Sequence, residues 1–234
     1  MFVFIMFKHV AFIPARKGSK GFKFKNRILF THTANFINQI DWFSDVVVST
    51  DDPVIKELAV KYGYSIHSRP NSLSSDDVSI KSVFKSYIDS IEPDSNTVLW
   101  LFYLTVLHKS LTDFLTAKNM IEVDKAQSVC TFVKAKTHPY DTWLYKTGNT
   151  LAKYIENDVY RRQDKPEAWE HYHYVCCFVS NQLNNLNSEL IGQSTIPIIL
   201  DDNTAAKLVE VDTQLDLDNW CRQSNYVDIK NEIQ

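Results

Sequence analysis

Five cationic side chains and two glycines occur within a short segment near the start of the chain. They are Arg16, Lys17, Gly18, Lys20, Gly21, Lys23 and Lys25. The apolar residues 9–15 before this segment predict a strand, and a helical pattern starts near Asn26. Backbone N–H groups of such a loop and of the following helix N-terminus can converge on an anion, and glycine lets the ligand come close. The segment therefore predicts a polyphosphate-binding loop.

The charges alone are equally compatible with a solvated basic surface. The position of the loop favours binding, because a loop directly after the first strand of an α/β protein lies at the carboxyl edge of the sheet, where nucleotides usually bind. The spacing matches neither Gly-x-x-x-x-Gly-Lys-Ser/Thr nor Gly-x-Gly-x-x-Gly. ATPase and dinucleotide-binding functions are therefore disfavoured.

A second group with chemical potential lies in residues 208–213, where apolar and acidic side chains alternate. In a strand, Glu210 and Asp212 would share one face about 7 Å apart at Cα. Two such carboxylates suit Mg²⁺, which binds carboxylates together with substrate phosphate oxygens and water. A solvated strand face is the commoner explanation of Glu-x-Asp alone. Together with the basic loop, the pair predicts magnesium-dependent nucleotidyl transfer.

The composition is that of a globular protein with no general attraction to polyanions. The 234 residues include 25 basic and 28 acidic ones, giving a net charge of -3, and 44% are hydrophobic. One domain over residues 1–234 is expected, with neither nucleic acid nor membrane as partner. The four cysteines, in the absence of C-x-x-C spacing, predict structural thiols. The apolar residues 1–7 are too few for a signal peptide or a membrane span, so a cytoplasmic protein is expected.

Strand and helix patterns alternate along most of the chain. Strands are expected over residues 9–15, 45–49, 65–68, 97–107 and 127–133, and helices over residues 26–40, 52–62, 78–91 and 110–122. This alternation predicts a mainly parallel, doubly wound α/β sheet covered on both faces.

Residues 136–175 differ from this pattern and predict a small β-rich excursion. Its aromatic residues are Trp143, Tyr145, Tyr154, Tyr160, Trp169, Tyr172 and Tyr174. For each one, ordinary core packing is favoured over an interface, but as a group they indicate a dimerisation surface and hence a homodimer.

Five motifs occur in the order seen in the acylneuraminate cytidylyltransferases, the CMP-sialic acid synthetases. They are Ile-Pro-Ala-Arg-Lys-Gly-Ser-Lys with Lys-Asn (13–20 and 25–26), Val-Ser-Thr-Asp-Asp (48–52), Arg-Pro with a following Asp (69–70 and 76), Arg-Arg-Gln-Asp-Lys-Pro (161–166) and Val-Asp-Thr (211–213). The chain resembles this family over about residues 9–218. The resemblance implies a Rossmann-like nucleotidyltransferase fold, a homodimer, and transfer of CMP from CTP to a 2-keto-3-deoxy sugar acid with release of pyrophosphate.

The resemblance also assigns roles to residues. Nucleotide binding falls to Ala15, Arg16, Gly18, Ser19, Lys20, Lys25, Asn26, Arg69 and Asp76, and catalysis to Arg16, Lys25 and Asp212. Sugar binding falls to Thr105, Arg161, Arg162, Gln163 and Asp164, and Mg²⁺ binding to Glu210 and Asp212. The anomeric hydroxyl of the sugar is expected to attack the α-phosphorus of CTP.

The chain departs from the family in three places. Gln-Pro-Thr-Ser-Pro-Leu-Arg is replaced by Phe-Tyr-Leu-Thr-Val-Leu-His at residues 102–108, and Asn-Gly by Tyr172-His173. Glu210 stands where the family often has Asp. Thr105 and His108 are candidates to replace the missing amide and basic side chain, although a core or surface role explains His108 equally well.

Other acidic residues leave alternatives open. Asp51 and Asp52 are possible further metal ligands, with helix capping favoured for Asp52. For Asp216 and Asp218, capping of the last helix is an equally good explanation. A CMP-Kdo synthetase and a relative that has kept the fold but lost catalysis are the alternative functions.

Overall fold

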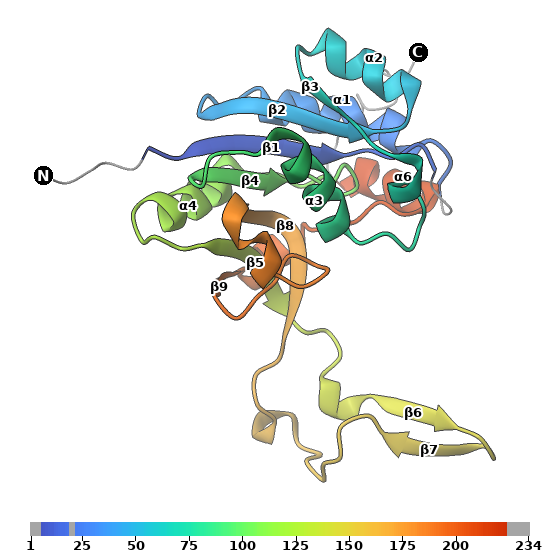
Figure 1. The fold of residues 1–234 in the computed structure, drawn as a ribbon. Coiled ribbons are helices and arrows are strands. Elements are labelled where there is room, and N and C mark those ends of the chain that lie inside the picture. The colour runs from blue at the N-terminus through green and yellow to red at the C-terminus, as the bar shows by residue number, and fades with distance from the viewer. Residues whose placement is uncertain (1–5, 19–21, 224–234) are drawn as a thin grey trace, which may run out of the picture.

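The computed structural model describes residues 6–18 and 22–223 (Figure 1). A seven-stranded sheet has the order β3-β2-β1-β4-β8-β5-β9, in which β8 runs antiparallel to its neighbours and the other paired strands are parallel. The strands are β1 Lys8–Pro14, β2 Phe43–Thr50, β3 Ser65–Ser68, β4 Thr97–Leu101, β5 Ser128–Lys134, β8 Trp169–Val179 and β9 Thr195–Ile199. The helices are α1 Lys25–Ile37, α2 Pro53–Lys61, α3 Ile80–Ile91, α4 Leu111–Glu122, α5 Asp202–Ala205 and α6 Gln214–Gln223. The predicted doubly wound α/β architecture is confirmed.

Both faces of the sheet are covered by apolar packing. On one face, α1, α2 and α4 contribute Leu29, Ile55 and Phe114 to a core that also includes side chains of β4. On the other face, α3 contributes Phe84, which packs edge-on against Phe178 of β8. Burial on two sides explains why the central strands are continuous apolar runs in the sequence.

The loop after β4 is shaped differently from the prediction. The strand ends at Leu101, and residues 102–110 form an irregular segment in place of the expected strand end. Phe102 and Leu104 of this segment are nonetheless buried, and the Phe102 ring stacks on Phe114 at 5.1 Å. A buried loop carries the same apolar signal as a buried strand, which is why the sequence pattern misplaced the boundary.

The predicted strand over residues 208–213 is also wrong. Only Glu210 takes part in β pairing there, in an isolated antiparallel bridge with Val106. The backbone N–H of Val211 donates to the Thr105 carbonyl at 2.9 Å. The segment is therefore tied to the loop after β4, and this places its carboxylates at the carboxyl edge of the sheet.

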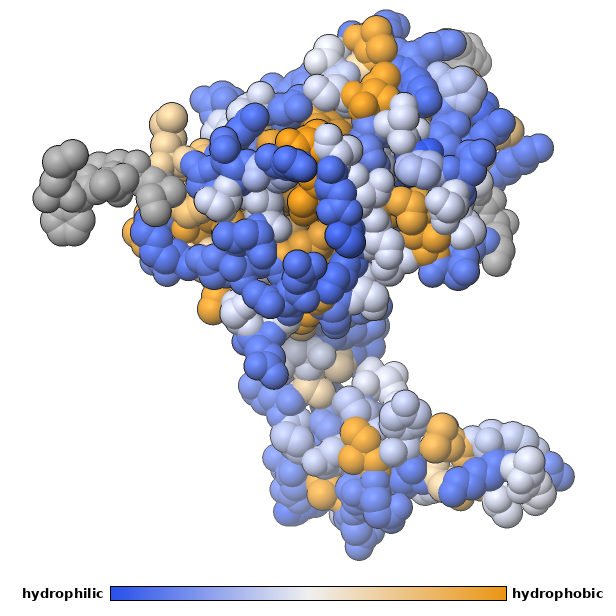
Figure 2. Space-filling view, viewed as in Figure 1, coloured by the Kyte–Doolittle hydropathy of each residue, from blue (hydrophilic) through white to orange (hydrophobic). Residues whose placement is uncertain are grey.

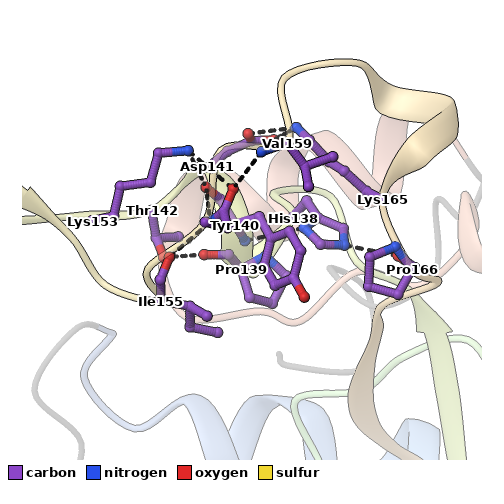
Figure 3. Close-up of polar contacts among 11 residues, drawn as sticks. His138, Pro139, Tyr140, Asp141, Thr142, Lys153, Ile155, Val159, Lys165 and Pro166 are labelled. Atoms are coloured by element: carbon purple, nitrogen blue, oxygen red, sulfur yellow. Dashed lines mark hydrogen bonds and ion pairs between the residues drawn. The ribbon is translucent and has the colours of Figure 1, made fainter.

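A hairpin projects away from the main sheet between β5 and β8 (Figure 1). Its strands are β6 Trp143–Lys146 and β7 Thr150–Lys153. At its base, Lys165 contacts both carboxylate oxygens of Asp141 at 2.5 and 2.7 Å, and His138 Nε2 donates to the Pro166 carbonyl at 2.9 Å (Figure 3). β8 begins at Trp169, so the last residues of the predicted excursion already belong to the main sheet.

Most aromatic residues of the predicted excursion are exposed, contrary to the core packing favoured for each. Trp143, Tyr145, Tyr154, Tyr160 and Trp169 are 40% to 88% exposed, and Figure 2 shows apolar patches on the projecting lobe. Among the seven, Tyr174 is buried, because it lies where β8 has entered the main sheet.

A buried histidine lies in β1. The His9 Nδ1 accepts a hydrogen bond from Trp100 Nε1, and its Nε2 donates to Glu122 Oε1, both at 3.0 Å. Two defined partners specify one tautomer of a neutral ring. Burial lowers the pKa of His9, and the neighbouring Glu122 opposes that shift only in part.

In the part of the chain that the structure describes, no helix is both long enough and apolar enough to cross a bilayer. The three cysteines of β5 and β8, Cys130, Cys176 and Cys177, are buried free thiols, as a structural role requires.

Candidate active site

The basic loop leaves β1 at the carboxyl edge of the sheet. Ala15 is buried, and its N–H donates to the Ser49 carbonyl of β2 at 2.9 Å. Arg16 forms an ion pair with Asp76, and the side-chain amide of Asn26 donates to the Arg16 carbonyl at 2.8 Å. These contacts hold the Arg16 guanidinium at the start of the loop. Ser19 and Lys20, also predicted to bind phosphate, lie outside the described residues.

The next cation faces the distal carboxylates. Lys25 is the first residue of α1, and its Nζ donates to Asp212 Oδ1 at 2.7 Å. Glu210 lies beside them, and its Oε1 accepts a hydrogen bond from the Thr105 hydroxyl at 3.3 Å. The structure thus brings together the two predicted groups, although 187 positions separate Lys25 from Asp212 in the chain.

The electrostatics of the carboxylate pair suit a hard cation. Burial raises the pKa of Glu210, the nearby Asp212 raises it further, and Thr105 and Lys25 offset only part of the shift. A bound cation would stabilise the charged form of Glu210, which burial and the neighbouring carboxylate disfavour. No cluster of three or more potential metal ligands occurs among the described residues. Glu210 and Asp212 are a donor set that fits Mg²⁺, because Mg²⁺ commonly takes one or two carboxylates plus substrate oxygens and water.

The third cationic side chain of the site, Arg69, is more deeply buried than Arg16. Arg69 follows β3 and is 9% exposed, and its Nε donates to the Leu73 carbonyl at 2.7 Å. Burial lowers the pKa of Arg69, with the nearby Asp51 opposing and Arg16 reinforcing the shift. The guanidinium is still charged at neutral pH. It adds a second fixed positive charge close to Arg16.

Two other acidic residues, Asp52 and Asp216, have structural roles. Asp52 caps α2 by accepting from the Val54 N–H at 3.0 Å, and it also pairs with Arg27 at 2.8 and 3.0 Å. The favoured capping role of Asp52 is therefore confirmed. At the start of α6, Asp216 accepts from the Thr213 N–H at 2.7 Å while its own N–H donates to the Thr213 hydroxyl at 3.2 Å. This reciprocal arrangement is a capping box.

The cationic side chains and Glu210 line one cavity of about 250 Å³. Its lining residues are Pro14, Arg16, Lys25, Asn26, Arg69, Ser75, Asp76, Val78, Ile80, Val83, Tyr103, Thr105 and Glu210. Seven of the predicted site residues thus share a single cavity, and Lys25 links it to Asp212. The apolar wall from α3 and Tyr103 was not predicted, because helix periodicity marks Ile80 and Val83 only as core.

The predicted sugar-binding residues 161–164 lie elsewhere in the chain. Arg162 and Gln163 line a separate cavity of about 690 Å³ at the base of the hairpin, together with Lys134 and Lys136. Arg161 Nε pairs with Asp164 Oδ2 at 2.7 Å. Of the predicted sugar-binding residues, Thr105 is the one that lines the smaller cavity.

His108 does not line this cavity either. Its ring packs against Tyr174 with the centroids 5.5 Å apart, and burial lowers its pKa. A packing role therefore explains His108 better than replacement of a basic sugar contact.

A solved structure shares this arrangement of elements. The chain matches CMP:2-keto-3-deoxy-manno-octonic acid synthetase complexed with CTP, with a TM-score of 0.60, 16% identity and coverage of 91% of this chain and 96% of that one. At this identity the match establishes the fold. The chain therefore shares the α/β fold of that synthetase, with its seven-stranded sheet and covering helices.

Sequence comparisons show what the chain is similar to. Residues 10–99 match the cytidylyltransferase family model. The N-acylneuraminate cytidylyltransferase of Streptococcus agalactiae serotype V is 28% identical over 186 residues, covering 75% of this chain and 44% of the relative. Post-translational flagellin modification protein B of Campylobacter coli is 26% identical over 227 residues, covering 87% of this chain and 89% of the relative. The chain is therefore similar to cytidylyltransferases over residues 10–99 and, at lower identity, over most of its length, and it spans about half the length of the Streptococcus relative.

Proposed function

We propose that the protein transfers CMP from CTP to the anomeric hydroxyl of a nonulosonate, a 2-keto-3-deoxy sugar acid of the sialic acid type, and that it requires Mg²⁺. The observation that carries the proposal is the single cavity in which Arg16, Lys25 and Arg69 meet Glu210. Lys25 also donates a hydrogen bond to Asp212, which lies outside the cavity lining. Cations and a metal-binding carboxylate pair are the two parts of a site for a metal-bound nucleoside triphosphate.

The nucleotidyl-transfer reaction requires a different contribution from the cations and from the carboxylates of the site. The sugar hydroxyl attacks the α-phosphorus, a new O–P bond forms, and the bond to the bridging oxygen breaks, so that pyrophosphate leaves with the bonding electrons and the hydroxyl proton passes to solvent. Arg16 and Lys25 would stabilise the charge that builds on the phosphate oxygens. Mg²⁺, held by Glu210 and Asp212, would supply further neutralisation of that charge.

The chemistry of the acceptor follows from the relatives and from the cavity. One relative is named for N-acylneuraminate and the matched structure for 2-keto-3-deoxy-manno-octonic acid, and both compounds are sugar acids. A carboxylate-bearing acceptor suits a cavity with three cationic side chains. Because the sequence match to the first relative is closer, we place nonulosonates first and Kdo second.

We also propose that the protein is a homodimer through the projecting hairpin. Trp143, Tyr145 and Leu151 of this hairpin are 54%, 72% and 62% exposed. Large apolar side chains clustered on one projection are typical of an interface with a further protein surface.

The experiment is a pyrophosphate-release assay with CTP, Mg²⁺ and a panel of nonulosonic acids and Kdo. We expect sugar-dependent release by the wild type and a loss of at least 100-fold in kcat/KM for Asp212→Asn. Glu57→Gln is the matched control, since Glu57 is an exposed carboxylate on α2 outside the cavity lining. Folded wild-type protein that releases no pyrophosphate with any acid of the panel would contradict the proposal.

A further inference from the structure

Two departures from the family pattern, far apart in the sequence, meet at the cavity. Tyr103 lies in the loop after β4 and lines the cavity, whereas Tyr172 and His173 lie in β8. The His173 ring meets the Tyr103 ring edge-on, with the centroids 5.5 Å apart and the planes at 78°. Successive residues of a strand point to opposite faces. His173 therefore contacts Tyr103, whereas the preceding residue, Tyr172, lies near the carboxylate pair. Burial, then Glu210 and Asp212, raise the pKa of Tyr172.

His173 is held in one orientation. Its Nε2 donates to the Glu189 carbonyl at 2.8 Å, which places the ring hydrogen on Nε2 and leaves Nδ1 as an acceptor. Burial lowers the pKa of His173 from its ordinary value, so the ring is neutral at pH 7. The His171 ring packs edge-on at 4.8 Å, and its Nε2 lies 3.1 Å from Glu189 Oε2. These contacts fix the imidazole behind Tyr103.

The two histidines contact Glu189, which lies in a turn over residues 187–191 that has several hydrogen bonds of its own. The Asn187 side-chain oxygen accepts from the N–H groups of Glu189 and Ile191 at 2.9 and 3.0 Å. Lys81 of α3 donates to the Leu186 carbonyl, which ties the turn to the helix that forms the apolar wall of the cavity. Tyr103 is therefore supported from behind by a rigid unit.

Tyr103 presents a specific chemical surface to the cavity. Arg69 and Glu210 line the same cavity, and both influence the Tyr103 hydroxyl electrostatically. Burial raises the pKa of Tyr103, and Cys176 and Glu210 add to the shift, so the hydroxyl keeps its proton at neutral pH. Within the described residues, this hydroxyl makes no hydrogen bond to the protein. The side chain thus offers an aromatic ring and an available O–H donor.

We infer that Tyr103, positioned by His173, determines which sugar acid the cavity accepts, and that it selects an acid carrying an acylamino substituent. This inference rests on the proposed cytidylyltransferase function. An acylamino group has an apolar end to pack on the ring and a carbonyl to accept from the phenol. A hydroxyl substituent lacks the apolar end that packs on the Tyr103 ring. With such a sugar the buried phenol is left partly unpaired, so the cavity discriminates against sugars that carry only a hydroxyl at this position.

The test is steady-state kinetics with an N-acylated nonulosonate and with Kdo, varying the sugar and CTP separately. We expect Tyr103→Ala to raise the KM for the acylated acid at least tenfold, with the KM for CTP changed less than twofold. Tyr103→Phe keeps the ring and should show a smaller increase. His173→Gly, which removes the support, should raise the same KM three- to tenfold, and His173→Asn should restore part of the loss. Tyr62→Phe, at the residue that caps the C-terminus of α2 outside the cavity lining, is the control.

Two results would overturn the inference in distinguishable ways. If the wild type converts nonulosonates but Tyr103→Ala leaves the sugar KM and the preference over Kdo unchanged, the assignment of Tyr103 is wrong and the proposed function stands. If the folded wild type converts no sugar acid of the panel, the proposed function is wrong and the inference falls with it.

Discussion

Replacing Phe102 by the glutamine that the family commonly has at this position should destabilise the protein without restoring a sugar contact. The Phe102 side chain is 2% exposed, stacks on Phe114 with the planes at 7°, and meets Phe43 edge-on at 5.7 Å. It lies in the core and is not part of the cavity lining. An amide at this position would replace an apolar contact with a polar group that has no evident partner.

The size of the effect follows from three contributions. Loss of a buried phenylalanine removes about 2–3 kcal/mol of apolar transfer free energy, and loss of favourable ring pairing removes about 0.5–1.5 kcal/mol. A buried amide without full hydrogen bonding costs about 1–3 kcal/mol. Because these contributions overlap, we expect a decrease of about 3–5 kcal/mol in the free energy of unfolding, or roughly 10 °C in Tm.

Urea denaturation followed by fluorescence and circular dichroism would measure this change. Phe102→Leu is the matched control, since it keeps an apolar side chain and should lose much less stability than Phe102→Gln. A Phe102→Gln protein within 1 kcal/mol of the wild type, or one with a lowered KM for the sugar acid, would refute the placement of Phe102 in the core.

Three further predictions concern acidity and assembly. Thr105→Val removes a hydrogen bond that lowers the pKa of Glu210, so the acid limb of the kcat/KM profile should move to higher pH; an unmoved limb would exclude Glu210 as the titrating group. The pKa of His9 is lowered in the folded protein. Its contribution to the free energy of unfolding is therefore present above about pH 6.5 and is lost as the pH falls towards the folded pKa. Stability measured from pH 7 to 5 should therefore decline less steeply in His9→Gln, and equal slopes would contradict this. Trp143→Asp should shift the protein from dimer to monomer in sedimentation, whereas an unchanged species would exclude the hairpin as the interface.

The sequence predicted that the basic loop and the acidic pair belong to one site better than it predicted their surroundings. The two groups could be combined in advance because their charges are complementary, and the structure places Lys25 Nζ 2.7 Å from Asp212 Oδ1. The sheet architecture was equally accessible, since strands buried on both faces are long apolar runs.

The missed features depend on tertiary context. The loop after β4 is as apolar as a strand because Phe102 packs inwards, so periodicity could not show that it ends β4 early. Glu210 sits in a single β bridge instead of a strand, and that bridge needs a partner distant in sequence, Val106. Contact between Tyr103 and His173 could not be predicted either, because it requires the antiparallel placement of β8 beside β4.

The most direct test of the proposed function is ³¹P NMR of a reaction containing CTP, Mg²⁺ and an N-acylated nonulosonic acid. The account predicts that wild-type protein converts CTP into a CMP-sugar phosphodiester and pyrophosphate in equal amounts, and that omission of Mg²⁺ or the Asp212→Asn substitution abolishes both signals. Hydrolysis of CTP without a CMP-sugar signal, or equal conversion by Asp212→Asn, would contradict the account.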